Sequence, residues 1–425
     1  MLERTFFAIA VIVLVARCAG LIFERFHQPQ VIGEIVGGII LGPTVAGTAL
    51  GHTLFPADIR PSLAVVGQLG LVLYMFTVGM RLNFRTARAN PRMVSLISLA
   101  SITVPFALAM PLAALLLTHH RSVGGHPVNT TAFVLFVGTS LSITAFPVLA
   151  RILEERRMQN TELGTIATAC AAVQDVAGWC MLAVILVIAS AHGGVGDVAR
   201  IALEAGGCVA GAFVLARLVG AVDRHLSAIR PDGGSDGFLL PAAVICLLAC
   251  AGATEAVGLH AVFGAFVFGG VMRRYLPAAP RARLAARITP ITRSTLLPIY
   301  FIIPGLSVDL RTLDSRDVIE IGLILLVACV GKIGGAFVSG RLSGLSPRQA
   351  STMGVLMNTR GLVELVVLQV GLSAGIIDER LFSELVLMAV VTTLMTQPLL
   401  TRVLRAGTGA RGEAEVGRLL ALDSH

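Results

Sequence analysis

Three polar residues interrupt long apolar stretches of the chain. Asp175, with Gln174 beside it, falls near the middle of the apolar run 167–189, and Lys332 falls inside the run 323–338. A charged group at the centre of a bilayer costs about 3 kcal/mol or more unless it is paired or functional. Because burial disfavours the ionised carboxylate, a proton and a metal cation can compete for Asp175. The pattern predicts exchange of a cation for a proton; the simpler alternative is a hydrogen bond between two helices.

Lys332 is the single lysine among 33 basic residues. Gly331, Gly334 and Gly335 flank it, and small residues let membrane helices approach closely. We expect Lys332 either to act as a charge partner of Asp175 when no ion is bound, or to be a fixed counter-charge that never titrates.

The apolar segment 129–150 contains several hydroxyl groups and a proline. Ser140 and Thr144 precede Pro147, which removes a helical hydrogen bond. Hydroxyl groups can satisfy unwound backbone, so a break is expected here, with Ser140 and Thr144 as further ligands of the cation beside Asp175 and Gln174. The alternative is an ordinary kinked helix.

The segment 349–374 carries a second polar interruption. It contains Asn358, Thr359, Arg360 and Glu364 within an apolar run. Arg360 and Glu364 are spaced i, i+4 and can pair on one helix face. Discontinuous helices at corresponding positions of two repeats indicate the ion site of a secondary transporter, so we expect the two breaks to cross there.

The composition places these segments in a membrane. Of the 425 residues, 55% are hydrophobic and 14% charged, against about 25% charged in soluble proteins, and the mean hydropathy is +0.84. A run of about 20 apolar residues crosses a bilayer as a helix. We therefore predict an all-α polytopic membrane protein of about thirteen spans, at 5–23, 30–50, 62–80, 93–117, 129–150, 161–190, 198–221, 237–256, 259–273, 286–306, 318–340, 349–374 and 381–404.

Two halves of the chain resemble one another. Tyr74 and Gly79 align with Tyr300 and Gly305 at one constant offset. The same offset aligns Leu71, Arg85 and Thr86 with Leu297, Arg311 and Thr312, and places Asn83 opposite Asp309. An odd number of spans separates the copies, so they would have opposite orientations. Inverted repeats at about 30–190 and 257–405 are expected, within a single membrane transport domain at 1–405.

Charge placement predicts the orientation. Arginines are concentrated in the connections that follow odd-numbered spans, for example Arg81, Arg92, Arg151, Arg273 and Arg274. By the positive-inside rule these connections and the C-terminus are cytoplasmic and the N-terminus is outside, in a bacterial inner membrane. This topology accounts for the formal charge of +8 without a nucleic-acid partner. A short flexible cytoplasmic tail is expected at 406–425.

Several function classes are disfavoured. A phosphate-binding loop needs Lys followed by Ser or Thr, and Lys332 is followed by Ile333. The GxGxxG match at 407–412 follows a membrane helix rather than a strand, so it is not a dinucleotide site. The seven cysteines lie in apolar segments without metal spacing. We expect no enzyme activity, no cofactor, no nucleotide domain in this chain, and no metal beyond the transported cation.

The remaining ionisable groups are expected to be wet. Glu320 and Glu384 lie near segment ends, where water or headgroups can reach them. His119, His120 and His126 share one external connection. They could sense pH or bind a metal loosely, but a solvated loop is the favoured interpretation.

Three motifs resemble a known family. The run 30–43, QVIGEIVGGIILGP, is similar to the second-helix motif of the monovalent cation/proton antiporter superfamily, in the branch of Kef-type potassium efflux systems and plant cation/proton exchangers. The runs 142–153, SITAFPVLARIL, and 357–365, MNTRGLVEL, are especially like the plant exchangers.

The resemblance implies a homodimer in which a core domain moves like an elevator against a dimerisation domain. It implies that Asp175 carries the ion and the proton. Gln174 stands where Kef-like proteins have Gln, which favours electroneutral exchange, whereas Lys332 resembles a lysine of electrogenic members.

The sequence therefore predicts a secondary antiporter that exchanges K⁺ or Na⁺ for H⁺ by alternating access. A proton-driven exporter of an organic cation or a metal–ionophore complex is the first alternative, and an ion-gated sensor or channel the second.

Overall fold

The structure is a computed structural model that describes residues 2–26, 28–45, 55–56, 58–81, 90–159, 161–189, 195–229, 236–257, 261–306, 308, 311 and 314–405. The predicted tail at 406–425, with its GxGxxG match, lies outside the described residues. So do Asn83, Arg85, Thr86, Asp309 and Thr312 of the predicted repeat.

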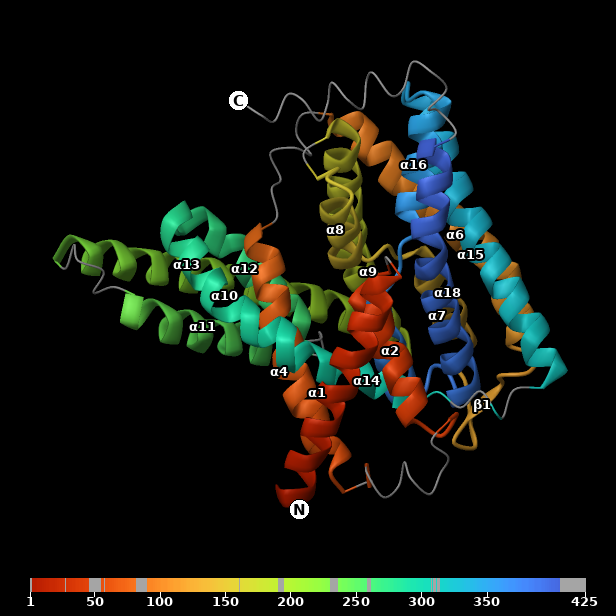
Figure 1. Ribbon diagram of the computed structural model, residues 1–425, viewed down its shortest axis with the longest axis horizontal. Coiled ribbons are helices and arrows are strands. Elements are labelled where there is room, and N and C mark those ends of the chain that lie inside the picture. Colours follow the sequence, from red (N-terminus) through yellow and green to blue (C-terminus); the bar gives the residue numbers. More distant parts are fainter. Residues whose placement is uncertain are drawn as a thin grey trace. The chain divides into compact units, whose positions relative to one another are not determined.

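The described chain is almost entirely helical (Figure 1), which confirms the all-α class. Eight of the described helices are long and apolar enough to cross a membrane: α1 (Leu2–Arg25), α4 (Arg60–Arg81), α6 (Pro91–Leu116), α9 (Glu162–Ala189), α10 (Val195–Ile229), α11 (Asp236–Ala256), α15 (Ser315–Leu342) and α18 (Glu379–Arg405). Each of the other predicted spans contains shorter helices, so the number of spans stays a prediction.

The shorter elements occupy the remaining apolar segments. They are α2 (Gln30–Leu41), α7 (Thr130–Ser142), α8 (Phe146–Glu155), α12 (Ala261–Tyr275), α13 (Ala278–Ile291), the π-helical turn η1 (Thr292–Leu296), α14 (Leu297–Leu306), α16 (Pro347–Met357) and α17 (Leu362–Ser373). A short antiparallel hairpin follows α6. Its strands β1 (Ser122–Val123) and β2 (His126–Pro127) have two residues each, with Ser122 opposite Pro127 and Val123 opposite His126.

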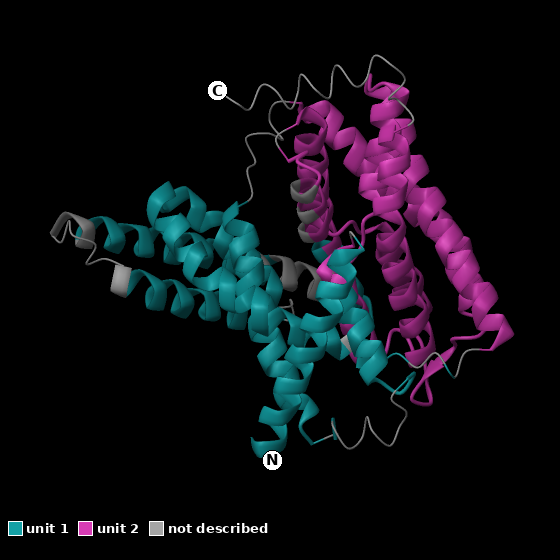
Figure 2. Ribbon diagram, in the orientation of Figure 1, with its two compact units in different colours: residues 1–26, 33–83, 179–312 teal, residues 27–32, 84–178, 313–425 magenta. Residues whose placement is uncertain are grey.

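The chain divides into two compact units (Figure 2). Unit 1 comprises Met1–Phe26, Gly33–Asn83 and Trp179–Thr312, and unit 2 comprises His27–Ile32, Phe84–Gly178 and Leu313–His425. All the residues predicted to form the ion site belong to unit 2.

Glycines set the helix spacing in unit 1. A Cβ on Gly38 of α2 would lie 2.4 Å from the Ile302 carbonyl oxygen of α14, and one on Gly79 of α4 would lie 2.3 Å from the Phe266 carbonyl oxygen of α12. The predicted repeat maps α2 onto α12 and α4 onto α14, so it would map the first contact onto the second. This packing is compatible with the repeat, which stays a prediction.

In unit 2, α6 and α15 approach closely beside Lys332. A Cβ on Gly331 would lie 2.6 Å from the Pro105 Cα, and one on Gly335 would lie 2.8 Å from the Ala100 carbonyl oxygen. The expected close approach is therefore present at Gly331 and Gly335. Gly334 has no contact within 4 Å for such a Cβ, so its inclusion was wrong: it lies about 100° around the helix from Gly335 and therefore off the face that packs against α6.

Polar caps fix where two helices of unit 2 begin. The Asp314 carboxylate accepts from the Asp317 amide, and the Asp317 carboxylate accepts from the Asp314 amide, in a capping box at the start of α15. Ser346 and Gln349 form the same reciprocal pair at the start of α16. Each box satisfies backbone donors that a helix end leaves open, which sets the register of the residues that follow.

Candidate functional site

The break predicted in segment 129–150 is present. α7 ends at Ser142 and α8 begins at Phe146, with Ile143 in extended conformation at φ −76° and ψ 144°. Pro147 is the second residue of α8, where a missing N–H costs nothing because helix starts leave those donors unpaired anyway. The proline therefore lies in the first turn of the new helix after the break.

The break predicted in segment 349–374 is also present. α16 ends at Met357 and α17 begins at Leu362. Gly361 has φ 149° and ψ −125°, a conformation that is essentially restricted to glycine. A side chain there would also meet Val148, whose Cγ2 would lie 2.7 Å from the added Cβ.

The two breaks contact each other. The Ala145 amide donates to the Thr359 carbonyl oxygen at 3.0 Å. The Thr144 hydroxyl lies 2.7 Å from the Met357 carbonyl oxygen and 2.8 Å from Gln174 Oε1, and its single proton can serve one of them at a time. Polar backbone that is unwound inside unit 2 thus finds partners in the opposite break.

Arg360 closes the end of α7 from the other break. Its side chain is fully buried, and the guanidinium donates to the carbonyl oxygens of Ser140 at 2.6 Å and Leu141 at 2.5 Å. It also forms the predicted i, i+4 ion pair with Glu364, at 2.9 Å. A cation at a helix C-terminus offsets the negative end of the helix dipole, so Arg360 supplies both charge and donors that the broken helix lacks.

Lys332 is fully buried and donates to neutral oxygens. Its ammonium lies 2.7 Å from Thr144 Oγ1, 2.7 Å from Gln174 Oε1 and 3.4 Å from Ser101 Oγ. Among the described side chains, no ion pair within 4.0 Å joins it to Asp175. The direct pair considered from the sequence is therefore absent from this structure, because α6, α9 and the break after α7 place three neutral acceptors around the ammonium.

Asp175 is 1% exposed on α9. Among the described atoms, neither of its carboxylate oxygens has a hydrogen-bond partner. The Lys332 charge and the Phe146 backbone amide, at the first residue of α8, both act on it electrostatically.

Other buried oxygens at the breaks also lack a hydrogen-bond partner. Within the described part of the chain, further buried oxygens without a hydrogen-bond partner belong to four of the predicted site residues: Ser140 Oγ, Asn358 Oδ1, Thr359 Oγ1 and Glu364 Oε2. More than about 90% of buried polar groups in proteins have a partner. An accumulation of unsatisfied oxygens therefore indicates a place prepared for a cation or for water.

The structure adds two contributors that sequence reasoning missed. Ser101 of α6 accepts from Lys332, and Met357 offers its carbonyl oxygen to Thr144 and its sulfur to the Gln174 amide at 3.4 Å. Ser101 is one hydroxyl in an apolar helix and gave no signal. Met357 had one: it directly precedes the polar run that begins at Asn358.

Three residues expected to be wet are buried. Glu320 is 5% exposed, Glu384 0% and His120 4%, so the sequence-based interpretation of these groups as solvated was wrong. Residues following α6 fold back onto the first turns of α15 and α18, which hydropathy along the chain could not indicate.

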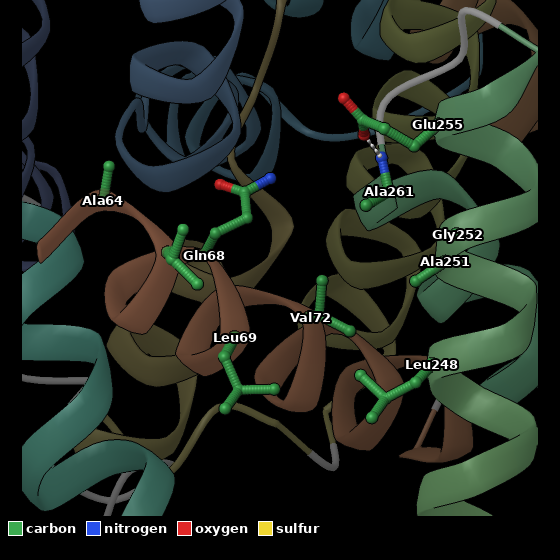
Figure 3. Close-up of a pocket in the computed structure, with 10 residues that line it drawn as sticks. Ala64, Gln68, Leu69, Val72, Leu248, Ala251, Gly252, Glu255 and Ala261 are labelled. Atoms are coloured by element: carbon green, nitrogen blue, oxygen red, sulfur yellow. Dashed lines mark hydrogen bonds between the residues drawn. The ribbon is translucent and has the colours of Figure 1, made fainter. Parts of the chain in front are cut away.

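A groove in unit 1 does not compete as a cation site (Figure 3). It has a volume of about 530 Å³ and is lined mostly by aliphatic side chains of α4, α11 and α12. Its one carboxylate, Glu255, accepts the Ala261 amide at 2.7 Å. None of the predicted site residues lines it.

Comparison with known proteins agrees with this architecture. The family described as "Sodium/hydrogen exchanger, transmembrane" matches residues 10–405. The chain is 35% identical over 407 residues to the Na⁺/H⁺ antiporter NhaS4 of Synechocystis, covering 93% of this chain and 96% of that protein.

Eukaryotic relatives are longer. The chain is 33% identical to the cation/H⁺ antiporter 18 of Arabidopsis thaliana over 96% of its own length and 50% of that protein. It is 33% identical to the K⁺/H⁺ antiporter 1 of Saccharomyces cerevisiae over 92% of its own length and 45% of that protein. The chain thus spans about half the length of these two relatives.

A solved structure shares the fold. The sodium proton antiporter MjNhaP1 of Methanocaldococcus jannaschii aligns with a TM-score of 0.64 over 96% of this chain and 97% of that one, at 16% identity. The chain belongs to the transmembrane sodium/hydrogen exchanger family, within the monovalent cation/proton antiporter superfamily that its motifs resemble.

Proposed function

We propose that this protein exchanges K⁺ or Na⁺ for H⁺ and that Asp175 binds both in turn. The observation that carries the proposal is the buried Asp175 carboxylate, which has no hydrogen-bond partner among the described atoms. An ionised carboxylate in that position needs a bound cation or a proton to offset its desolvation. Relatives named as Na⁺/H⁺ and K⁺/H⁺ antiporters support cation/proton antiport in general.

The remaining ligands of the cation are Gln174 and Thr144, with Ser140 Oγ a further oxygen at the break. Lys332 lies 2.7 Å from both the Gln174 and the Thr144 oxygen, so its ammonium stands in the place of a coordinated monovalent cation. An entering K⁺ or Na⁺ competes with Lys332 for these two oxygens while gaining the Asp175 charge.

Exchange is electroneutral in this scheme because Asp175 is the one group that gains and loses a proton during the cycle. Lys332 has three acceptors, and a neutral amine could donate to only two of them. If Lys332 keeps its proton through the cycle, Asp175 alone alternates between cation and proton. One cation then crosses for each proton.

Transport proceeds by an elevator-type movement of the core. Two facts support this: all nine predicted site residues belong to unit 2, and the breaks are linked by hydrogen bonds within that unit. Unit 2 can therefore carry the site as one body, with unit 1 as the dimerisation scaffold of a homodimer. The membrane is the bacterial inner membrane, with the N-terminus outside and the C-terminus in the cytoplasm.

Proton flux in liposomes tests the carrier role. Purified protein is reconstituted with a pH-sensitive dye inside, and Na⁺, K⁺, Li⁺ or Rb⁺ is added outside in turn. Wild type is compared with Asp175→Asn and with Asp58→Asn, the same chemical change at an exposed position. We expect at least one cation to trigger flux in wild type and Asp58→Asn, and none in Asp175→Asn.

Two outcomes would contradict the proposal. Retained exchange in Asp175→Asn would remove Asp175 from the carrier role. If none of the four cations triggers proton flux in wild type, the result would favour an organic cargo or a sensor. Stoichiometry is read separately: flux accelerated by a membrane potential imposed at equal pH would refute electroneutral exchange.

A further inference from the structure

Unit 2 contains a second buried cluster of ionisable groups, which the proposed transport cycle does not use. His120 follows the end of α6, Glu320 lies near the start of α15, and Glu384 lies near the start of α18. One ligand atom from each of the three lies within 4.8 Å of the other two. All three residues are at most 5% exposed.

Glu384 is the unexplained member of this cluster. Its side chain is 0% exposed, and among the described atoms neither carboxylate oxygen has a hydrogen-bond partner. A buried carboxylate without a donor is costly, and Glu320 beside it adds a like charge. A positive ligand between the two carboxylates would remove both penalties.

His120 is oriented as a metal ligand would be. Its Nδ1 lies 2.7 Å from Asp378 Oδ2, and its Nε2 faces Glu320 Oε2 at 3.2 Å. With Asp378 accepting from Nδ1–H, the lone pair of Nε2 points into the cluster. Metal-binding histidines commonly have such a carboxylate on the far ring nitrogen, because it fixes the tautomer and the ring orientation.

The surroundings are strongly acidic. Asp317 faces the same region, offset by Arg380 at a distance of 4.0 Å. Burial lowers the pKa of His120, but the hydrogen bond and charge of Asp378, with Glu320 and Glu384, outweigh it and raise the pKa to about 9. The carboxylates of Asp317, Glu320, Asp378 and Glu384 thus make the surroundings of His120 favourable for a cation.

One neighbour of the cluster is exposed. His119 contacts Glu320 and is 46% exposed on its side chain. Glu320 is therefore separated from the surface by one side chain.

We propose that His120, Glu320 and Glu384 bind one divalent transition-metal ion, with Zn²⁺ the best match. An imidazole with two carboxylates suits zinc better than the all-oxygen shells of Mg²⁺ and Ca²⁺. Zinc bonds of about 2.0–2.2 Å place tetrahedral ligands about 3.4 Å apart. The present separations of up to 4.8 Å close to that value with small side-chain rotations.

The bound ion would join three segments of unit 2 that are far apart in sequence. It would tie the residues after α6 to the first turns of α15 and α18, and α15 carries Lys332. The role is structural or regulatory and is independent of ion exchange at Asp175. Sequence spacing could not reveal it, because His120 and Glu320 are 200 residues apart.

Zinc binding to untagged protein in detergent tests the proposal. The protein is stripped with EDTA, dialysed and titrated with Zn²⁺, with Mg²⁺ and Ca²⁺ for comparison. The bound metal is counted by mass spectrometry, and Tm is measured by differential scanning calorimetry. We expect about one Zn²⁺ per chain, a rise in Tm of several degrees, and no comparable effect of Mg²⁺ or Ca²⁺.

Matched variants locate the site. Glu384→Gln and His120→Gln should lose the zinc-dependent rise in Tm, and Asp378→Asn should weaken binding about 10–100-fold. Glu379→Gln on the same helix and His126→Gln on the same connection change exposed residues and should bind as wild type. Asp175→Asn should also bind normally, which separates this result from the test of transport.

Wild type without a bound zinc would overturn the proposal. Equal binding by wild type and Glu384→Gln would do the same. So would binding lost in His126→Gln but kept in Glu384→Gln, because it would place the ion on the exposed loop. The Tm of each metal-free variant shows that it is folded, and the near-isosteric Glu384→Gln is the variant of choice.

Discussion

Replacing Arg360 with Gln should destabilise unit 2 by about 4 kcal/mol. The change leaves Glu364 buried without its partner, and removing one member of a buried ion pair costs about 3–5 kcal/mol. It also removes the donors to the carbonyl oxygens of Ser140 and Leu141. These costs overlap, because the glutamine amide can keep one of the acceptors, so their sum would overestimate the effect.

The partner substitution should cost less. Glu364→Gln keeps an oxygen at the position that accepts from Arg360, and the guanidinium keeps both carbonyl acceptors, so about 2 kcal/mol is expected. The double variant replaces the pair with two neutral amides and leaves no unpaired charge. Its cost should fall below the sum of the single costs by about 2 kcal/mol, a coupling typical of residues in direct contact.

Thermal unfolding in detergent measures these differences. At about 2 °C per kcal/mol, Arg360→Gln should lower Tm by about 8 °C and Glu364→Gln by about 4 °C. Arg402→Gln, the same change at an exposed position of α18, is the control and should leave Tm unchanged. The reasoning is refuted if Arg360→Gln has the same Tm as Arg402→Gln. It is also refuted if the double variant loses as much stability as the two single variants together.

Three further outcomes are expected. Gly361→Ala should cost about 1–3 kcal/mol in thermal unfolding and slow liposome flux, because its φ of 149° disfavours a side chain. Gly331→Val should lower both Tm and flux, because its Cβ would lie 2.6 Å from Pro105, whereas Gly334→Val, with nothing within 4 Å, should leave both unchanged. With EDTA present, the stabilisation that comes from His120 should be complete below pH 6.5 and be lost as the pH rises through about 9, because its pKa is higher in the folded state. The loss is at most about 3 kcal/mol, and a Tm–pH profile that His120→Gln leaves unchanged would contradict it.

Features determined by neighbouring residues could be predicted from the sequence. The break before α8 follows from the hydroxyl groups and from Pro147, since proline favours the first turn of a helix and disfavours its interior. The ion pair of Arg360 and Glu364 follows from their i, i+4 spacing across the start of α17. In both cases the chemistry and its consequence lie within a few residues of each other.

Features determined by packing between distant segments could not. The sequence allows Lys332 to pair with Asp175 or to be a fixed counter-charge, but it does not indicate the three acceptors, which come from α6, α9 and the break after α7. The burial of His120 likewise depends on contacts with Glu320 and Asp378, which are 200 and 258 residues away. Hydropathy along one segment carries no information about which other segment covers it.

The charges of unit 2 suggest how one chain can hold so many ionisable groups at the breaks and still move one proton. Arg360 and Glu364 neutralise each other at 2.9 Å and are tied to the end of α7, so neither needs to change protonation when a cation enters. Lys332 is surrounded by neutral acceptors, which can be shared with a cation without a change in net charge. Of the two carboxylates at the breaks, Asp175 is the one for which neither oxygen has a hydrogen-bond partner among the described atoms, and it therefore gains most from whichever positive ligand arrives. In the exchange proposed above, the cation-loaded and proton-loaded states would then differ only in the occupant of the Asp175 carboxylate, and this is the condition for one-for-one exchange.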